Sequence, residues 1–583
     1  MSFLSSPPPS PSLPSFLPRH GKRPAALFFR LRLYRRLLLG LCGLILLAWI
    51  GTHSSASSHH SSHAQVLFPQ GAGQRYELVG GSSLPDEPCA LIVTDKRGKS
   101  KWTVWIPQRS SLLQAAQYAE LCAQSAEISE RLAGGKRGGY RKTHERLYPT
   151  AKDPFFVDVE EAEAEGLLPE RFPQLTLEVH TLPNGKSEET GKAPMMVCER
   201  SLTYMLESTE AGLGKTLMGL WMAYGLAQKE GRAFFIDDKR WAYGSFSNYF
   251  VPPPPAPCLP PPSYHTLPCP HTARHLLVSA STLPHVFGHA PTTELADPRK
   301  LDPRHQRRLF ALARTGYEAL FRLTPDDSRY VDERAVSLFS AAKENGGISI
   351  GLHVRRGDCH PFEYQYQRDY LPLDRYLDAA HEVLASRNRH TSNISMLSSA
   401  APAEASTSSS ASPDPLAHHL ATTSSRIVLA SDDPDVYAAP EMAHITTRAQ
   451  DRIVLASKAT LAHHSPKPQN NKQGFVDEQD GWDRGFYSAV FWNLGRGRSF
   501  LATPTTSAGK ATEEKVPEQV MRLRELVGRA YLLDLGVLAQ TDAVVCGVSA
   551  AGCRLLAVMM GEKAVLDGAW RNVDAGLGWR GID

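Results

Sequence analysis

The residues with the clearest chemical potential follow a short apolar run in the second half of the chain. Ile348–Val354 is rich in β-branched residues, and the segment His353-Val-Arg-Arg-Gly-Asp358 starts at its end. Strands buried in parallel sheets have this apolar character, and open α/β sheets bind ligands at the carboxyl ends of their strands. The paired Arg355 and Arg356 suit an anion with many oxygens. The segment predicts a diphosphate clamp, with a structural salt bridge among the arginines and Asp358 as the alternative.

Three later segments carry further polar groups. The strand-like run from Ile427 ends in Asp432 and Asp433, and Ser549 follows another such run in a tight turn. Asp534 lies on an expected helix. A carboxylate can accept both the N1–H and the N2 amine of guanine, so Asp534 is suited to selecting a guanine nucleotide. A solvated helix carboxylate is the alternative for this residue.

The glycine turn Gly212-Leu-Gly-Lys-Thr216 resembles a P-loop only superficially. The P-loop needs glycine where this chain has Thr209, and no strand is expected ahead of the turn. We therefore exclude an ATPase. Gly212 and Gly214 still open an expected helix, 217–228, whose N–H groups are available to an anion.

Taken together, three ordered motifs resemble the α1,6-fucosyltransferase family that modifies N-glycan cores, and more distantly the α1,2- and protein O-fucosyltransferases. They are His-x-Arg-Arg-x-Asp, Ala-Ser-Asp-Asp-Pro, and Val-Cys followed by Ser and Cys-Arg. The resemblance covers about residues 195–560. Trp241-Ala-Tyr243 also looks like the donor-proximal loop of that family.

The resemblance implies an α/β, GT-B-like fold with two Rossmann-like halves and an inverting transfer from GDP-fucose without metal or other cofactor. Arg355 would bind the β-phosphate, and Glu363 would be the base, unless it is a surface acid. Tyr243 and Asp534 would contact guanine, and Ser549 the phosphates. The full donor-binding set is His353, Arg356, Asp358, Tyr243, Asp432, Asp433, Asp534, Ser549, Gly212 and Gly214.

Some positions depart from the family pattern. Cys359 stands where the family has a basic residue, and Ala550-Ala551 replaces a polar pair. The family's glycine-rich donor loop is matched only in part, and its C-terminal SH3-like domain is not expected here. Two alternatives therefore stay open: a fucosyltransferase with another acceptor, either α1,2 or a protein hydroxyl, and a non-catalytic nucleotide- or glycan-binding relative.

Strand and helix patterns alternate over most of the chain, which predicts a parallel sheet covered by helices. We expect a stem over 52–194 with a helix at 110–132, an N-terminal catalytic half over 195–345, and a donor-binding half over 346–583. Disordered insertions are expected at 386–425, 458–472 and 502–515. The remaining expected elements are 233–237, 305–323, 332–344, 348–354, 373–385, 427–430, 453–456, 519–540, 543–546, 554–560 and 564–566.

Charge is concentrated at the N-terminus. Residues 1–36 hold seven of the 64 Lys and Arg residues and no acid, so the rest carries 57 basic against 60 acidic residues. This balance argues against a nucleic-acid partner. The basic segment precedes an apolar stretch, 37–51, that we interpret as a signal anchor. It predicts a single-pass type II Golgi membrane protein with a luminal catalytic region, and a cleaved signal peptide is the alternative. An oligomer is possible, but nothing in the sequence supports one.

The cysteines suit an oxidising compartment. Cys546 and Cys553 could close a small loop, and Cys198 could pair with Cys258 or Cys269. Lone buried thiols are the alternative for Cys89, Cys122 and Cys359. Asn393-Ile-Ser395 is an N-glycosylation sequon that a luminal location would expose.

Overall fold

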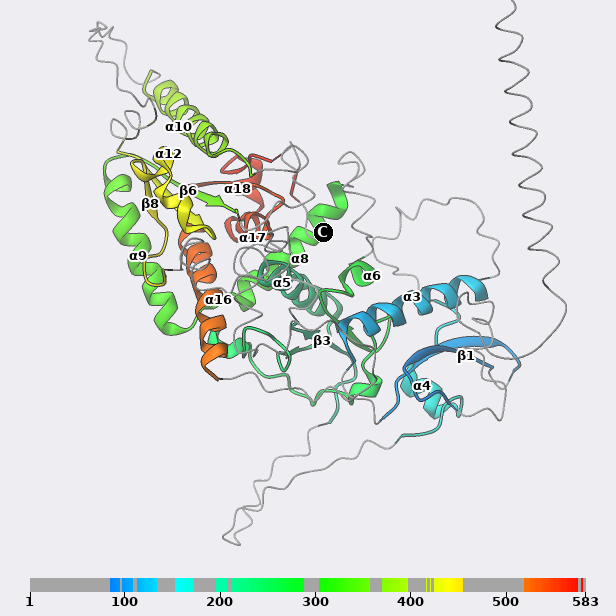
Figure 1. The fold of residues 1–583 in the computed structure, drawn as a ribbon. Helices are drawn as coiled ribbons and strands as arrows, with labels where there is room; N and C mark the ends of the chain where they lie inside the picture. Colours follow the sequence, from blue (N-terminus) through cyan, green and yellow to red (C-terminus); the bar gives the residue numbers. More distant parts are fainter. Residues whose placement is uncertain are drawn as a thin grey trace, which may run out of the picture. The chain divides into compact units, whose positions relative to one another are not determined.

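The computed structural model shows a mixed α/β protein with two parallel sheets (Figure 1). One separate two-stranded antiparallel sheet precedes them. The structure describes residues 84–94, 97–108, 113–133, 153–171, 196–207, 212–287, 303–356, 370–396, 416, 420, 424–454, 518–574 and 578–579.

The first described elements form an N-terminal layer. Strands β1 (Cys89–Thr94) and β2 (Ser100–Trp105) pair antiparallel, and helices α3 (Ala115–Leu132) and α4 (Val159–Ala164) pack beside them. The helix expected over 110–132 is confirmed as α3. Buried side chains of this layer share a hydrophobic cluster with Leu267 and Leu277. Ordered packing thus begins well before residue 195, where the sequence had suggested that the globular region starts.

A three-stranded parallel sheet follows, with the strand order β4-β3-β5. Its strands are β3 (Ser201–Met205), β4 (Ala233–Asp237) and β5 (His275–Val278), and helix α5 (Leu213–Glu230) connects β3 to β4. The expected strand at 233–237 is confirmed. The expectation that no strand precedes the glycine turn is wrong, because β3 ends seven residues before Gly212. The short elements η2 (Phe246–Asn248), η3 (Ser263–His265) and α6 (Leu283–Phe287) complete this part.

The larger parallel sheet has five strands in the order β10-β9-β6-β7-β8. They are β6 (Ser349–Val354), β7 (Arg426–Ser431), β8 (Thr446–Arg448), β9 (Ala543–Cys546) and β10 (Trp570–Asn572). The helical connections are α10 (Leu373–Met396), η5 (Pro434–Ala438), α12 (Pro440–Ala443), α16 (Glu518–Leu538), α17 (Ala551–Met560) and α18 (Glu562–Leu566).

The structure corrects three expectations in this half. Residues 451–454 form a bend, and the strand lies earlier, at β8. Residues 564–566 belong to helix α18, and the last strand is β10. Helix α10 continues to Met396 and includes the first eleven residues of the first expected insertion. The insertions at 458–472 and 502–515 lie outside the described residues.

Two long helices, α8 (Pro303–Leu320) and α9 (Pro325–Glu344), join the two sheet regions. One hydrophobic cluster contains Leu202 and Tyr204 of β3 together with Val428 of β7 and Val544 of β9. The two sheets therefore share one core through α5, α8, α16 and α17. Continuous packing of this kind resists independent motion of the two halves.

Three disulfides join described residues: Cys122–Cys269, Cys198–Cys258 and Cys546–Cys553. The Cys546–Cys553 pair is confirmed, and the structure selects Cys258 as the partner of Cys198. The alternative of a lone thiol does not hold for Cys122, because a disulfide joins Cys122 of α3 to Cys269, in the loop before β5. Cys89 is buried and belongs to none of the three bridges.

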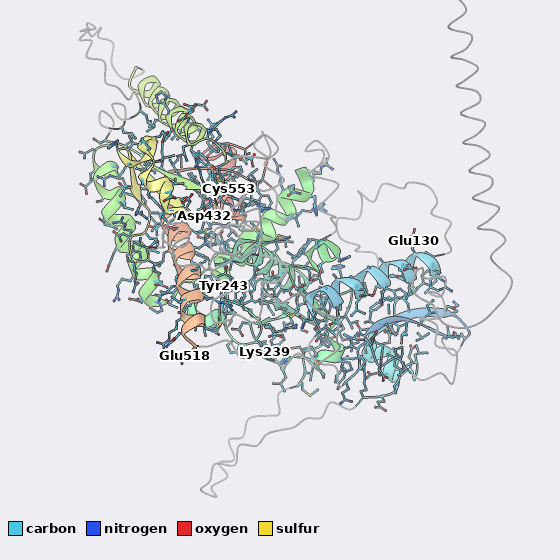
Figure 2. The ribbon with its side chains drawn as sticks, in the orientation of Figure 1. Glu130, Lys239, Tyr243, Asp432, Glu518 and Cys553 are labelled. Carbon is cyan, nitrogen blue, oxygen red and sulfur yellow. A yellow bond between two sulfur atoms is a disulfide. The ribbon has the colours of Figure 1, made fainter. Side chains whose placement is uncertain are left out.

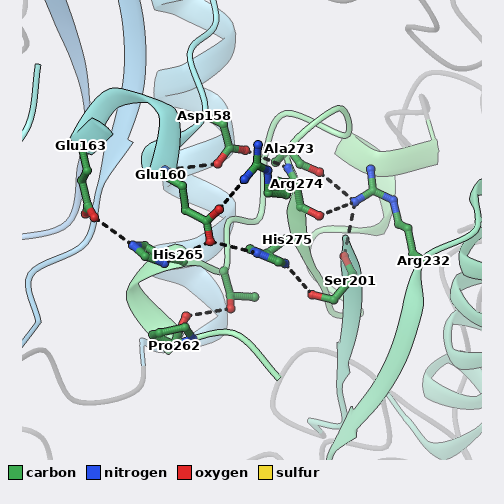
Figure 3. Close-up of polar contacts among 11 residues, drawn as sticks. Asp158, Glu160, Glu163, Ser201, Arg232, Pro262, His265, Ala273, Arg274 and His275 are labelled. Carbon is green, nitrogen blue, oxygen red and sulfur yellow. Dashed lines mark hydrogen bonds and ion pairs between the residues drawn. The ribbon is translucent and has the colours of Figure 1, made fainter. Parts of the chain in front are cut away.

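A network of carboxylates and histidines joins α4 to β5 (Figure 3). Glu160 Oε1 lies 3.2 Å from His275 Nε2 and 3.4 Å from His265 Nδ1, while its Oε2 accepts a 2.6 Å hydrogen bond from Arg274. Glu163 Oε2 lies 3.2 Å from His265 Nε2. Hydrogen bonds from His265 and then His275 hold the pKa of Glu160 well below its usual range, although burial opposes them.

No described helix has both the length and the hydrophobicity needed to cross a bilayer. The anchor expected at 37–51 and the basic segment before it lie outside the described residues.

Candidate functional site

The predicted anion clamp lies where the connectivity of the five-stranded sheet reverses. From β6 the chain adds β7 and β8 on one side and then β9 and β10 on the other. Ligands of open α/β sheets bind in the crevice outside the strand ends at such a switch point. His353 pairs in register with Ala430 and Cys546, so the polar residues after β6, β7 and β9 gather at one edge of the sheet. Asp432, labelled in Figure 2, follows β7.

His353 is the most unusual group at this edge. Its side chain is only 2% exposed, and neither ring nitrogen has a hydrogen-bond partner. A Cβ at Gly552 would come within 2.7 Å of His353 Cε1, so the imidazole lies directly against the first turn of α17. Burial first, and the charge of Arg355 second, lower the pKa of His353 to about 4. A neutral imidazole with open nitrogens at a helix N-terminus is available to a polar ligand.

Asp432 contacts the segment that carries the two arginines. Its Oδ1 accepts a 2.8 Å hydrogen bond from the backbone N–H of Arg356, while its buried Oδ2 has no partner. Burial raises the pKa of Asp432 to about 6, and the positive charge of Arg355 opposes that rise. The Arg356 guanidinium lies 5.2 Å from the centre of the Tyr370 ring. Both arginines are half-buried, so the strand end holds fixed positive charge next to His353.

Asp433 has a more local role. Its Oδ1 accepts a 3.0 Å hydrogen bond from the N–H of Asp435, which caps the short helix η5. The side chain is buried, and its own N–H donates to Ser431 Oγ. These contacts fit a structural residue better than a ligand contact.

Asp534 lies at the other side of β7. It is 2% exposed; its Oδ1 accepts a 3.3 Å hydrogen bond from the N–H of Gln450, and its Oδ2 has no partner. Burial raises the pKa of this carboxyl well above its usual range. The negative charge of Asp534 in turn contributes to the raised pKa of Tyr437, after burial, which places the two side chains near each other. A buried acceptor without a donor fits the predicted contact with a base.

The turn between β9 and α17 lies beside the clamp, because β9 pairs with β6 and ends at Cys546. Cys553, labelled in Figure 2, closes this turn through its bridge to Cys546. The N–H of Ser549 donates to Asp574 Oδ2 at 3.3 Å, and the N–H of Val548 donates to Asn572 Oδ1 at 2.8 Å. The backbone N–H of Ser549 therefore already has a carboxylate partner, and the contact of Ser549 with the phosphates stays a prediction.

The sequence analysis missed both Asn572 and Asp574. They lie in and just after β10, a strand of three residues that is too short to show an alternating pattern. The signal that could have identified them is the Asn-x-Asp spacing itself, which is typical of turns.

The glycine turn brings the start of α5 against α17. Gly212 precedes the first residue of α5, and a Cβ at Gly214 would come within 2.7 Å of both Ala551 Cβ and Tyr531 Oη. The N-terminal turns of α5 and α17 therefore touch, and both direct N–H groups toward this region. Helix N-termini attract anions through these groups and through the helix dipole.

Tyr243 packs against α16, the helix that also carries Asp534. It is 1% exposed, its ring packs on Gly528 of α16, and its carbonyl accepts a 2.7 Å hydrogen bond from Tyr249 Oη. Figure 2 labels Tyr243. Gly528 lies six residues before Asp534, or about 9 Å along a helix. The structure thus relates Tyr243 and Asp534 through one helix, α16.

Two predicted residues, Asp358 and Glu363, lie outside the described residues, as does Cys359. Within the described part of the chain, no group of three or more His, Cys, Asp or Glu side chains has the geometry to hold a metal ion. The residues that the fold does bring together are His353, Arg355, Arg356, Asp432, Ser549 and Gly214.

Comparisons with known proteins give limited matches. No family model matches the sequence, and no curated protein matches it. Among solved structures, the NodZ alpha-1,6-fucosyltransferase co-crystallized with GDP is similar at 13% identity and a TM-score of 0.24. The selenomethionine fucosyltransferase NodZ from Bradyrhizobium is similar at 13% identity and a TM-score of 0.23. Each alignment covers 61% of this chain and 91% of the other.

Proposed function

We propose that this protein is a GT-B-like, inverting fucosyltransferase that transfers fucose from GDP-fucose to a glycan, through an α1,6 linkage to the core of an N-glycan. The observation that carries the proposal is the cluster at the switch point of the larger sheet. There, Arg355 and Arg356 adjoin a buried neutral His353 and the N-terminus of α17. The order of the three motifs in the sequence supports the same assignment. We also propose that the protein is located in the Golgi and held there by an N-terminal membrane anchor.

The reaction needs no covalent intermediate. An acceptor hydroxyl attacks C1 of fucose, the bond from C1 to the β-phosphate oxygen breaks, and its electron pair leaves with GDP. Glu363 takes the proton of the attacking hydroxyl, as a general base does. Arg355 stabilises the negative charge that develops on the β-phosphate, and such charge stabilisation is commonly the largest catalytic contribution. The arginine thereby supplies positive charge at the leaving group.

The direct test is binding and turnover with the full chain. Arg355→Ala should reduce fucosyl transfer by about a hundredfold or more, as the loss of one key electrostatic contact does, while the circular dichroism spectrum stays unchanged. Radiolabelled GDP-fucose with an acceptor array measures transfer and identifies the linkage. Wild-type activity in this variant would remove Arg355 from the site.

Glu363→Gln tests the base separately. The amide cannot accept the proton, so kcat should fall by about a hundredfold or more, while the affinity for GDP stays the same. A surface acid would give unchanged kcat. Binding of GDP by the wild type without transfer to any glycan on the array would favour the non-catalytic alternative.

A further inference from the structure

A turn next to the donor site carries an arginine that the motifs do not account for. Arg448 ends β8, and its guanidinium carbon lies 3.6 Å from the centre of the Tyr437 ring. Stacking on an aromatic face holds a guanidinium flat and leaves its edge N–H groups open. Among the described residues, the half-buried guanidinium of Arg448 takes part in no hydrogen bond or ion pair.

Asp534 lies near Arg448 and has an acceptor atom that lacks a hydrogen-bond donor. Its buried Oδ2 lacks a donor, yet it forms no ion pair with Arg448. The two groups lie near each other, because Asp534 Oδ1 accepts a 3.3 Å hydrogen bond from the N–H of Gln450, two residues after Arg448. The charges of both groups also affect the pKa of Tyr437, whose hydroxyl accepts a hydrogen bond from the N–H of Ser431 at the end of β7. The N–H donors of Arg448 and the Oδ2 acceptor of Asp534 both lie near the Tyr437 ring. Together they suit a ligand whose edge carries hydrogen-bond acceptors and donors side by side.

The turn that carries Arg448 is held firmly from outside. Arg334 of α9 donates to the carbonyls of Arg448 and Ala449 at 2.9 and 3.1 Å. Tyr330 Oη donates to Asp451 Oδ1 at 2.7 Å and accepts from the N–H of Asp451 at 2.9 Å.

Two arginines extend this support to α16. The buried Asp327 accepts two hydrogen bonds from Arg529, at 2.6 and 2.9 Å, and one from Arg452 at 3.3 Å. Helices α9 and α16 are thus fastened to the turn and to each other. A residue fixed in this way loses little conformational entropy on binding, which favours a recognition role.

We propose that Arg448 is the second base-reading residue of the donor site: its guanidinium binds O6 and N7 of guanine while Asp534 binds N1–H and the N2 amine. This inference rests on the proposed GDP-fucose donor. Arginine recognises O6 and N7 of guanine as two parallel acceptors. Adenine carries an amine in place of O6 and a lone pair at N1. Its amine would face the N–H donors of Arg448, and its N1 lone pair would face the carboxylate of Asp534, so neither contact would form.

The test compares three nucleotides on the full chain by isothermal titration calorimetry: GDP, ADP and 7-deaza-GDP, which lacks the N7 acceptor. The wild type should bind GDP about tenfold or more tightly than 7-deaza-GDP, since one such base contact contributes about 1–3 kcal/mol. Arg448→Gln should lower GDP affinity by a similar factor and abolish the difference between GDP and 7-deaza-GDP. Its affinity for ADP should not change.

Two further variants make the result specific. Arg448→Lys keeps the charge but loses the planar pair of donors, so it should behave like Arg448→Gln toward 7-deaza-GDP. Arg522→Gln, on the exposed face of α16 where Arg522 pairs only with Glu518 among the described residues, is the matched control and should bind as the wild type does.

The outcomes separate the two proposals. If the wild type binds GDP but Arg448→Gln weakens GDP and ADP equally, Arg448 contacts phosphate or supports the fold, and only the base-reading role is wrong. Equal wild-type affinity for GDP and 7-deaza-GDP would also rule out the base-reading role alone. If the wild type binds no GDP, the donor assignment and the role of Arg448 are both wrong.

Discussion

At the scale of single residues, burial moves the pKa values of several groups in the site away from their ordinary values. His353 is buried without partners and has a pKa of about 4, so it is neutral at physiological pH. A neutral imidazole can donate from one nitrogen and accept at the other. In the proposed donor complex, the fixed positive charge next to the diphosphate comes from the arginines alone, and His353 contacts uncharged parts of the nucleotide.

Asp432 provides a pH prediction at this scale. Its pKa of about 6 in the folded protein exceeds the ordinary value of 3.8, so the folded state binds a proton more tightly between these values. Stability therefore falls as the pH rises through that window. Asp432→Asn removes this loss, and the stability of the variant relative to the wild type should rise from pH 4 to pH 7 by on the order of 3 kcal/mol. Urea unfolding at several pH values measures the difference, and parallel curves would contradict the prediction.

At the scale of elements, the contact between the first turns of α5 and α17 brings the two sheet regions to one place. Gly214 permits this contact, because any Cβ there would overlap Ala551 and Tyr531. The same geometry explains the small residue at 551, where the fucosyltransferase motif has a polar side chain. The two helix N-termini can face one anion only while this contact stays close.

Gly214→Ala tests the importance of that contact. The added methyl group must push the two turns apart, and such overpacking typically costs about 1–3 kcal/mol. The variant should unfold at lower urea concentration and bind GDP more weakly. Gly578→Ala is the control, since a Cβ at Gly578 meets open space and should change neither property. A stable Gly214→Ala variant with normal GDP affinity would show that the two turns do not act together.

At the scale of the whole molecule, the N-terminal layer is part of the folded body. It shares a hydrophobic cluster with the three-stranded sheet, and both a disulfide and the Glu160 network attach it. A stem that served only as a spacer would not need these contacts. The layer therefore stabilises the three-stranded sheet, to which α5 and its glycine turn are connected.

The Glu160 network makes this attachment dependent on pH. Because hydrogen bonds from His265 and His275 lower the pKa of Glu160, its contribution to stability is present above the ordinary value of 4.5 and is lost as the pH falls below it. Glu160→Gln should be less stable than the wild type at pH 7, and the difference should shrink below pH 4. Thermal unfolding at both pH values measures this. A difference that stays constant with pH would mean that Glu160 contributes only by packing.

The sequence alone was sufficient for the parts of this protein that depend on local patterns. The apolar run at 348–354 became β6, the runs near 427 and 543 became β7 and β9, and the paired cysteines 546 and 553 formed their bridge. Strand and helix periodicity is a local property, and seven-residue spacing of two cysteines restricts their partners strongly. Motif order also singled out His353 and Arg355 as candidate ligand contacts.

Only the tertiary structure decided what depends on distant residues. Short edge strands such as β8 and β10 lack a pattern of their own and form because a neighbouring strand is available. The pairing of Cys122 with Cys269 spans 147 residues, and local spacing cannot indicate it. Burial, which shifts the pKa values of His353, Asp432 and Asp534, is likewise a property of the packed whole. The sequence therefore determined which groups were available for chemistry, and packing determined which of them are buried, unpartnered and adjacent.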